Sequence, residues 1–222
     1  MKKKLIIITL SAAICMPSYS FAFGLGDITS SIPDVPGLSG GGGDVADLEK
    51  GQGELANETN KVLLEFATAL EVFREALGLE VDSSLKDAFA NCAPKKICTD
   101  GGEVIEKMVS SSDDVTKVMK SSEEEGVKLS AEARKTFEKG LVPYGRGILR
   151  GTALGLKISE VAPKYVNAVA ANPLTASSAL ATGMSIGKQI PPVLALFSGA
   201  SGGIYNFATF NGIEKPEEAE AE

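Results

Sequence analysis

The sequence predicts an all-α protein: a multi-helix bundle in which acidic amphipathic helices pack on a Gly/Ala-rich apolar C-terminal helical hairpin. Three observations predict this fold class. Apolar residues recur at steps of three and four over long segments, alternating strand-like runs with hairpin turns are absent, and two uncharged segments follow one another near the C-terminus. About 165 ordered residues are enough to form one core, so we expect a single helical domain over residues 45–213.

The first 22 residues have the pattern of a secretory signal peptide. Three lysines precede an apolar run too short to span a bilayer, and Ser20 and Ala22 occupy the −3 and −1 positions of a signal-peptidase site. We expect cleavage near Ala22 and a periplasmic or secreted bacterial protein. Ile14 stands where a lipobox before Cys15 would need a small residue, which disfavours a lipoprotein.

Residues 23–44 are rich in Gly, Ser and Pro and include four consecutive glycines. Such a composition predicts a flexible tether, with a docking peptide around Ile32 to Leu38 as the alternative. Asp44 then caps a predicted helix that carries one apolar stripe and ends near Leu77, with Gly78 as its stop. A short second helix is expected from Asp82 or Ser83 to about Ala90.

The segment from Glu103 to Lys139 carries a thin apolar stripe with small residues in its gaps. Ser110 and Ser122, each followed three residues later by an acidic residue, resemble capping boxes. The sequence therefore predicts either one helix or two or three helices in this segment.

Prolines divide the C-terminal third into predicted helices. Pro143 and Gly145 precede the first of them, Pro163 ends or kinks it, and Pro173 and the pair Pro191-Pro192 break the chain again. The expected helices cover residues 146–162, 164–171, 174–187 and 189–213, followed by an acidic disordered tail over 214–222.

The charge distribution divides the domain into an acidic half, 45–140, and an apolar and basic half, 141–213. The chain holds 22 basic and 29 acidic residues; without the three lysines of the leader, 19 basic residues remain and the net charge is −10. Five basic residues and one acidic residue lie in 141–213. Five cations are too few for the basic surface that nucleic acid requires, so we expect no nucleic-acid binding.

Cys92 and Cys98 are the two cysteines that remain after signal cleavage. An even count in an oxidising compartment predicts a disulfide between them, and the chain-entropy model gives roughly 2–2.5 kcal/mol for so short a loop. A redox-active pair is the alternative, which the spacing disfavours because it is not C-x-x-C.

Catalytic patterns are missing from the sequence. It has no histidine, the commonest general base and zinc ligand, and it shows no glycine-rich phosphate loop, nucleophile elbow or Ser/Lys dyad. We therefore expect a protein without enzymatic activity, metal or cofactor.

Glycines repeat at a spacing of four residues in the C-terminal third. At that spacing they line one face of a helix and allow a second backbone to approach closely. We interpret them as close helix packing in a water-soluble bundle, with membrane insertion or self-association as the alternative; the residues are Gly147, Gly151, Gly155, Gly183, Gly187, Gly199 and Gly203.

Four basic residues, Arg146, Arg150, Lys157 and Lys164, fall on one narrow stripe of a helical wheel. They pair with acidic helices or extend into water in the simpler interpretation. In the functional interpretation they contact anionic lipid headgroups or an acidic partner. Glu160 is suitably spaced for an i,i+4 pair with Lys164, which favours the simpler interpretation.

The apolar segment 165–213 carries one charge, Lys188, before the tail. Its length suits a membrane hairpin, but its many small residues and its prolines make a buried core hairpin the favoured interpretation over conditional or constitutive insertion. We therefore expect an exported, non-enzymatic interaction or assembly protein of the cell envelope that binds an envelope protein or a second copy of itself through small-residue helix faces. A membrane-active protein that meets an anionic surface, and a carrier with an apolar ligand cavity between glycine faces, are the alternatives.

Overall fold

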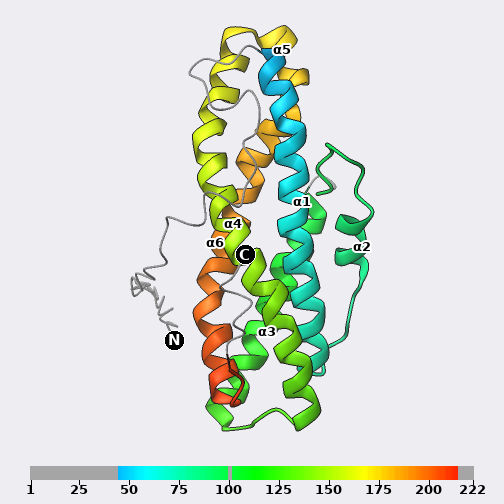
Figure 1. The fold of residues 1–222 in the computed structure, drawn as a ribbon, viewed down its shortest axis with the longest axis vertical. Coiled ribbons are helices and arrows are strands. Elements are labelled where there is room, and N and C mark those ends of the chain that lie inside the picture. The colour runs from blue at the N-terminus through cyan, green and yellow to red at the C-terminus, as the bar shows by residue number, and fades with distance from the viewer. Residues whose placement is uncertain (1–44, 100–101, 215–222) are drawn as a thin grey trace, which may run out of the picture.

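Six helices form the part of the chain that the structure, a computed structural model, describes: residues 45–99 and 102–214 (Figure 1). The predicted signal peptide, tether and nearly all of the predicted acidic tail lie outside these residues. The helices are α1 (Val45–Ala76), α2 (Ser84–Ala90), α3 (Glu103–Glu125), α4 (Ala131–Ala171), α5 (Pro173–Ala179) and α6 (Ala181–Phe210).

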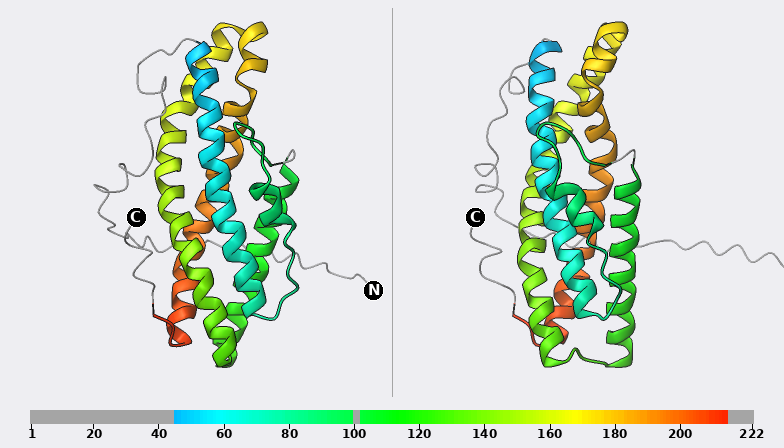
Figure 2. Two further views of the ribbon diagram at one scale, coloured as in Figure 1. Left: turned by 45° about the vertical axis from the view of Figure 1, so that its right-hand side comes forward. Right: turned by 90° about the vertical axis from the view of Figure 1, so that its right-hand side faces the viewer.

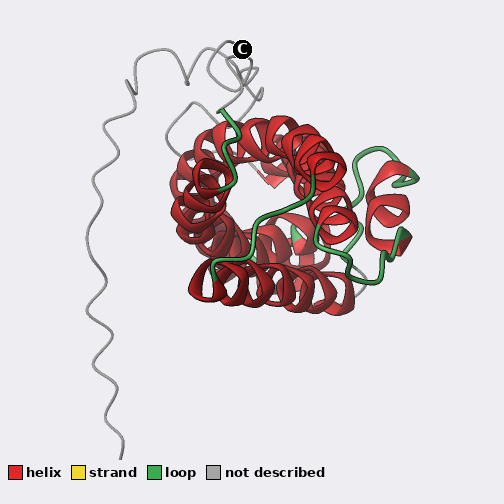
Figure 3. Ribbon diagram, turned by 90° about the horizontal axis from the view of Figure 1, so that it is seen from below, coloured by secondary structure: helices red, strands yellow, loops and turns green. Residues whose placement is uncertain are grey.

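The predicted all-α bundle is confirmed. The long helices α1, α4 and α6 run side by side along the molecule, and α4 is antiparallel to the other two (Figures 1 and 2). The contact between α1 and α4 is the most extensive, while α6 packs on α4, α3 and α1. The short helix α2 lies outside the ring of long helices, against α1 and α3 (Figure 3).

Aromatic side chains fill the space between the long helices. Phe66 of α1 stacks on Phe197 of α6 with ring centroids 4.0 Å apart, and Phe73 of α1 stacks on Phe137 of α4 at 4.5 Å. The hydroxyl of buried Tyr144 donates a hydrogen bond to the carbonyl of Phe197 at 2.6 Å, which satisfies its polar end inside the core. The three long helices are thus joined by one aromatic cluster.

The first two predicted helices are found where the periodicity places them. Helix α1 ends at Ala76, and Gly78 follows it with a φ of 68°, a left-handed conformation that glycine adopts without steric cost. Before α2, the carboxylate of Asp82 accepts a hydrogen bond from the amide of Ser84 at 2.9 Å. Local signals were sufficient here because each helix has its own stop and start.

The segment 103–139 forms the whole of α3 and the beginning of α4. Ser110 and Ser122, which resemble helix starts in the sequence, both lie inside α3. The actual start is Ser130, whose side chain accepts a hydrogen bond from the amide of Ala133 at 3.1 Å.

Three predictions made from the prolines are wrong: the helix start after Pro143, the helix end that is one of two alternatives at Pro163, and the turn at Pro191-Pro192. Helix α4 continues through Pro143 and Pro163, and α6 continues through Pro191 and Pro192. Pro163 and Pro192 are exposed, and so are Ser159 and Lys188 four residues earlier, whose carbonyls the two rings free on the side of the helix that faces water. The expected helix starts at residues 146 and 164 are therefore absent, and only the break at Asn172-Pro173 is found.

The apolar C-terminal hairpin consists of the antiparallel helices α4 and α6, joined by α5. The predicted segments 174–187 and 189–213 are not separate helices, because α6 starts at Ala181 and runs to Phe210. By length and composition α6 could cross a membrane, and 33% of its most apolar stretch is buried. The favoured interpretation of a buried core hairpin therefore holds for one side of α6 only, because the other side is exposed.

Three tyrosines give the fold a pH dependence. Burial raises the pKa of Tyr165 to about 12 and raises the pKa values of Tyr144 and Tyr205 above the ordinary value of 10.0 as well. Above pH 10 the unfolded chain releases these protons while the folded chain keeps them, so we expect stability to fall as pH rises from 10 to 12. Urea unfolding across this range, with tyrosinate absorbance recorded, measures the effect; tyrosinate that forms below pH 10 in these positions would contradict it.

Candidate functional site

The glycines of α4 and of the beginning of α6 lie against neighbouring helices. A Cβ on Gly147 would lie 2.7 Å from the ring of Phe66, and a Cβ on Gly183 would lie 2.6 Å from the ring of Tyr165. Gly151 and Gly187 are close to Leu194 and Ala162, at 3.1 and 3.2 Å. These four glycines allow close packing between helices within the chain.

Three predicted glycine positions differ from these four. Gly155 has only an ordinary contact, 3.5 Å from Leu194, and a Cβ on Gly199 or Gly203 would meet nothing within 4 Å. The expectation of close packing at Gly199 and Gly203 therefore fails within this chain, because both lie on the exposed side of α6. Gly202 is equally open, and Gly140 is packed against Phe73; neither was singled out from the sequence, since neither continues a four-residue repeat.

Exposed residues form a continuous band along α6, here called the outer face of α6. One of its members, Lys188, is charged, and most of the others are small. The buried residues Ile186, Ile190, Phe197 and Ile204 lie on the opposite side of the helix. The outer face consists of Met184, Lys188, Pro191, Pro192, Ala195, Ser198, Gly199, Gly203, Asn206 and Thr209.

The four basic residues singled out on α4 lie along one half-buried edge of that helix. Arg150 pairs with Glu65 of α1 at 3.7 Å, and Lys164 pairs with Glu160 at 3.4 Å. Lys157 also has an interaction partner inside the chain. The simpler interpretation of this stripe, that it pairs with acidic side chains, therefore fits these contacts best.

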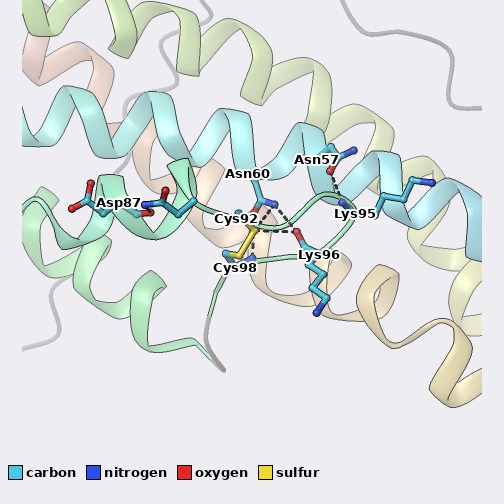
Figure 4. The surroundings of a disulfide bond; sticks show 8 residues. Asn57, Asn60, Asp87, Cys92, Lys95, Lys96 and Cys98 are labelled. Atoms are coloured by element: carbon cyan, nitrogen blue, oxygen red, sulfur yellow. Dashed lines mark hydrogen bonds between the residues drawn. A yellow bond between two sulfur atoms is a disulfide. The ribbon is translucent and has the colours of Figure 1, made fainter.

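The disulfide between Cys92 and Cys98 is present, with the two Cα atoms 5.8 Å apart (Figure 4). Two asparagines of α1 hold the loop that it closes. Asn60 donates to the carbonyl of Lys96 at 2.6 Å and accepts from the amide of Cys98 at 3.3 Å, and Asn57 accepts from the amide of Lys95 at 2.7 Å. The loop is thus fixed against the middle of α1 by hydrogen bonds. Nothing in the sequence distinguishes Asn57 and Asn60 from asparagines on the surface.

A groove of about 200 Å³ lies between α1, α2 and α3. Its charged side chains already have partners in the chain: Arg74 pairs with Asp114 at 3.2 Å, and Lys107 pairs with Glu103 at 3.4 Å. This groove is small and has a mixed polar and apolar lining, and it is not between the glycine faces, where side chains such as those of Phe66 and Tyr165 occupy the space. The contacts give no support to an apolar-ligand carrier.

Neither the acidic, cysteine and histidine side chains nor a comparison with known proteins indicates a further site. Within residues 45–99 and 102–214, no group of three or more acidic, cysteine or histidine side chains gathers in a way that could hold a metal ion. Comparison of the chain with protein-family models, with curated proteins and with solved structures finds no match. The outer face of α6 is thus the candidate site that the geometry supports best.

Proposed function

We propose that the chain is an exported, non-enzymatic docking protein of the bacterial cell envelope, and that its working surface is the outer face of α6. The observation that carries the proposal is the open environment of Gly199, Gly202 and Gly203 on α6, a helix of whose most apolar stretch 33% is buried. The partner is a helix of an envelope protein or of a second copy of the chain.

The cost of glycine in a helix supports this function. Each glycine in a helix interior costs up to about 1 kcal/mol relative to alanine. At Gly147 and Gly183 the close approach of an aromatic ring offsets that cost inside the chain. At Gly199 and Gly203 no contact of the chain does so, and the backbone of a partner helix is the neighbour that such a surface accommodates.

The near absence of charge on the outer face supports a helix as the partner. Lys188 lies near the beginning of the face, and the stretch from Pro191 to Thr209 has no ionised side chain. A partner therefore displaces water from this stretch without desolvating a charge, whose burial would be costly. Docking by shape and backbone approach, rather than by ion pairs, follows from this composition.

Photocrosslinking in cells tests the proposal. A photoreactive benzoylphenylalanine at Asn206, beside the glycines, should give a discrete adduct, whereas the same probe at Lys117, which is exposed on α3, should give none. Gly203→Arg should abolish the adduct at Asn206 without loss of thermal stability, because its side chain enters open space. The adduct's mass distinguishes a second copy from another protein; equal adducts at both probe positions, or an adduct that survives Gly203→Arg, would contradict the proposal.

A further inference from the structure

Residues 165–187 form one end of the bundle and include no ionised residue. They comprise the last turns of α4, the whole of α5 and the first turns of α6. We call these residues the α5 end. Three of the six exposed large hydrophobic residues in the described chain lie there: Leu174, Val166 and Met184, with exposures of 94%, 56% and 38%. Apolar side chains are thus concentrated on an end of the molecule that carries no charge.

Leu174 projects from a firmly held element. On the other side of α5 and at its end, Ala176 and Leu180 are fully buried. The side chain of Gln52 on α1 donates to the carbonyl of Ala179 and accepts from the amide of Gly183 at 2.9 Å, which fixes both ends of the turn into α6. The exposure of Leu174 is therefore a property of the packed fold.

The α5 end is also the outermost part of the bundle in this direction (Figure 2). The hydroxyl of Tyr165 reaches the carbonyl of Leu48 at 3.4 Å, which links α4 to the beginning of α1. After Tyr165, α4 continues for six residues, about 9 Å, whereas only three residues of α1, about 4.5 Å, precede Leu48. A flat surface that approaches this end would meet α5 before it meets the charged residues Asp47 and Glu49.

Two further observations indicate what covers this end. The charges that flank this end along the chain carry both signs: Lys164 pairs with Glu160 at 3.4 Å, Lys188 follows on α6, and Asp47 and Glu49 lie in the first turns of α1, so neither an anionic nor a cationic macromolecule is favoured by charge. The 44 residues before Val45 join the bundle at this same end, and they include the apolar leader. Until the expected cleavage near Ala22, an inserted leader would keep the α5 end close to the bilayer from which the chain emerges.

We propose that the α5 end is a membrane-contacting tip that enters the headgroup region of a lipid bilayer, with Leu174 as its deepest side chain. Three apolar side chains bury less area than a single acyl chain, which itself gives only reversible binding. The tip therefore binds reversibly, through apolar burial, with little dependence on salt. It orients the long axis of the bundle away from the membrane and leaves the outer face of α6 from Lys188 to Thr209 accessible along the side.

Single-tryptophan variants test this inference, since the chain contains no tryptophan. Leu174→Trp should show a blue shift of its emission as phosphatidylcholine vesicles are added to the exported protein. Val127→Trp, at a residue 54% exposed in the loop at the opposite end of the bundle, should show none. No shift at position 174, or an equal shift at both positions, would overturn the proposal.

Vesicle flotation supplies the second measurement. Leu174→Asp should lower the vesicle-bound fraction by about tenfold or more, because a buried leucine is lost and a charge is introduced, whereas Val127→Asp should leave it unchanged. The parent and both variants are compared without the leader, as in the exported protein, and both positions are exposed enough to preserve folding, which circular dichroism verifies. Binding only to phosphatidylglycerol vesicles that high salt abolishes, or a blue shift that tracks self-association without vesicles, would overturn the proposal. These results are independent of the crosslinking at Asn206.

Discussion

Gly183→Ala is expected to lower the free energy of unfolding by about 1–3 kcal/mol, the usual cost of adding a methyl group to a well-packed core. The new Cβ would lie 2.6 Å from the ring of Tyr165. That ring is fully buried and its hydroxyl is bonded to the carbonyl of Leu48, so it has no free direction in which to move. Urea unfolding of the variant and the parent at neutral pH measures the difference.

Gly199→Ala is the matched control for that experiment, since it makes the same chemical change in the same helix. No atom lies within 4 Å of the added Cβ, so only the backbone effect remains, and the variant should be more stable by about 0.5–1 kcal/mol. Opposite signs for the two variants would establish that one end of α6 is packed and the other is open. A loss of stability at Gly199 as large as that at Gly183 would contradict the open outer face.

Phe66→Ala is expected to have the larger effect, a loss of about 3–5 kcal/mol, which is typical of a buried aromatic residue. The ring of Phe66 occupies the space beside Gly147 of α4 and stacks on Phe197 of α6 at 4.0 Å. Its removal leaves a cavity where three long helices meet. Thermal and urea unfolding measure the loss, and a loss below about 1.5 kcal/mol, within the range of volume-conserving core changes, would contradict this packing.

The contact between Phe66 and Gly147 also predicts non-additivity. Gly147→Ala alone should destabilise the protein, because its Cβ would lie 2.7 Å from the Phe66 ring. In the Phe66→Ala background the ring is gone, so the same change should cost less or become favourable through helix propensity. A double-mutant cycle measures this coupling; strictly additive effects would show that the two residues do not share the space.

Local patterns in the sequence were sufficient to predict those elements whose signals lie within a few residues of one another. The apolar stripe of α1 and its stop at Gly78, the short helix α2 and the Cys92–Cys98 disulfide all follow from such signals. The prolines misled because their cost depends on the surroundings. Pro163 is an example: the residues that precede it, Ile158 and Val161, and Tyr165, which follows it, are all buried. This burial against the other helices stabilises a helix that the proline alone would end.

The candidate site required the fold for a different reason. A four-residue glycine repeat has the same appearance whether a neighbouring helix covers it or not, so Gly183 and Gly199 could not be distinguished from the sequence. The exposure of Leu174 was equally inaccessible, since it depends on which side of α5 the partner helices occupy. Sequence periodicity indicates that a helix has faces, but only the arrangement of the other helices decides which face is left open.

The bond network of Gln52 has a consequence for the order of folding. Gln52 meets Gly183 across a sequence separation of 131 residues, and α1 makes its most extensive contact with α4. As the chain is synthesised from its N-terminus, α1 therefore has no permanent cover for its apolar stripe until most of the later helices exist. Each of these contacts closes a long loop, so α1 reaches its final packing only after the distant helices have formed. The first helix to be made is thus among the last to be buried.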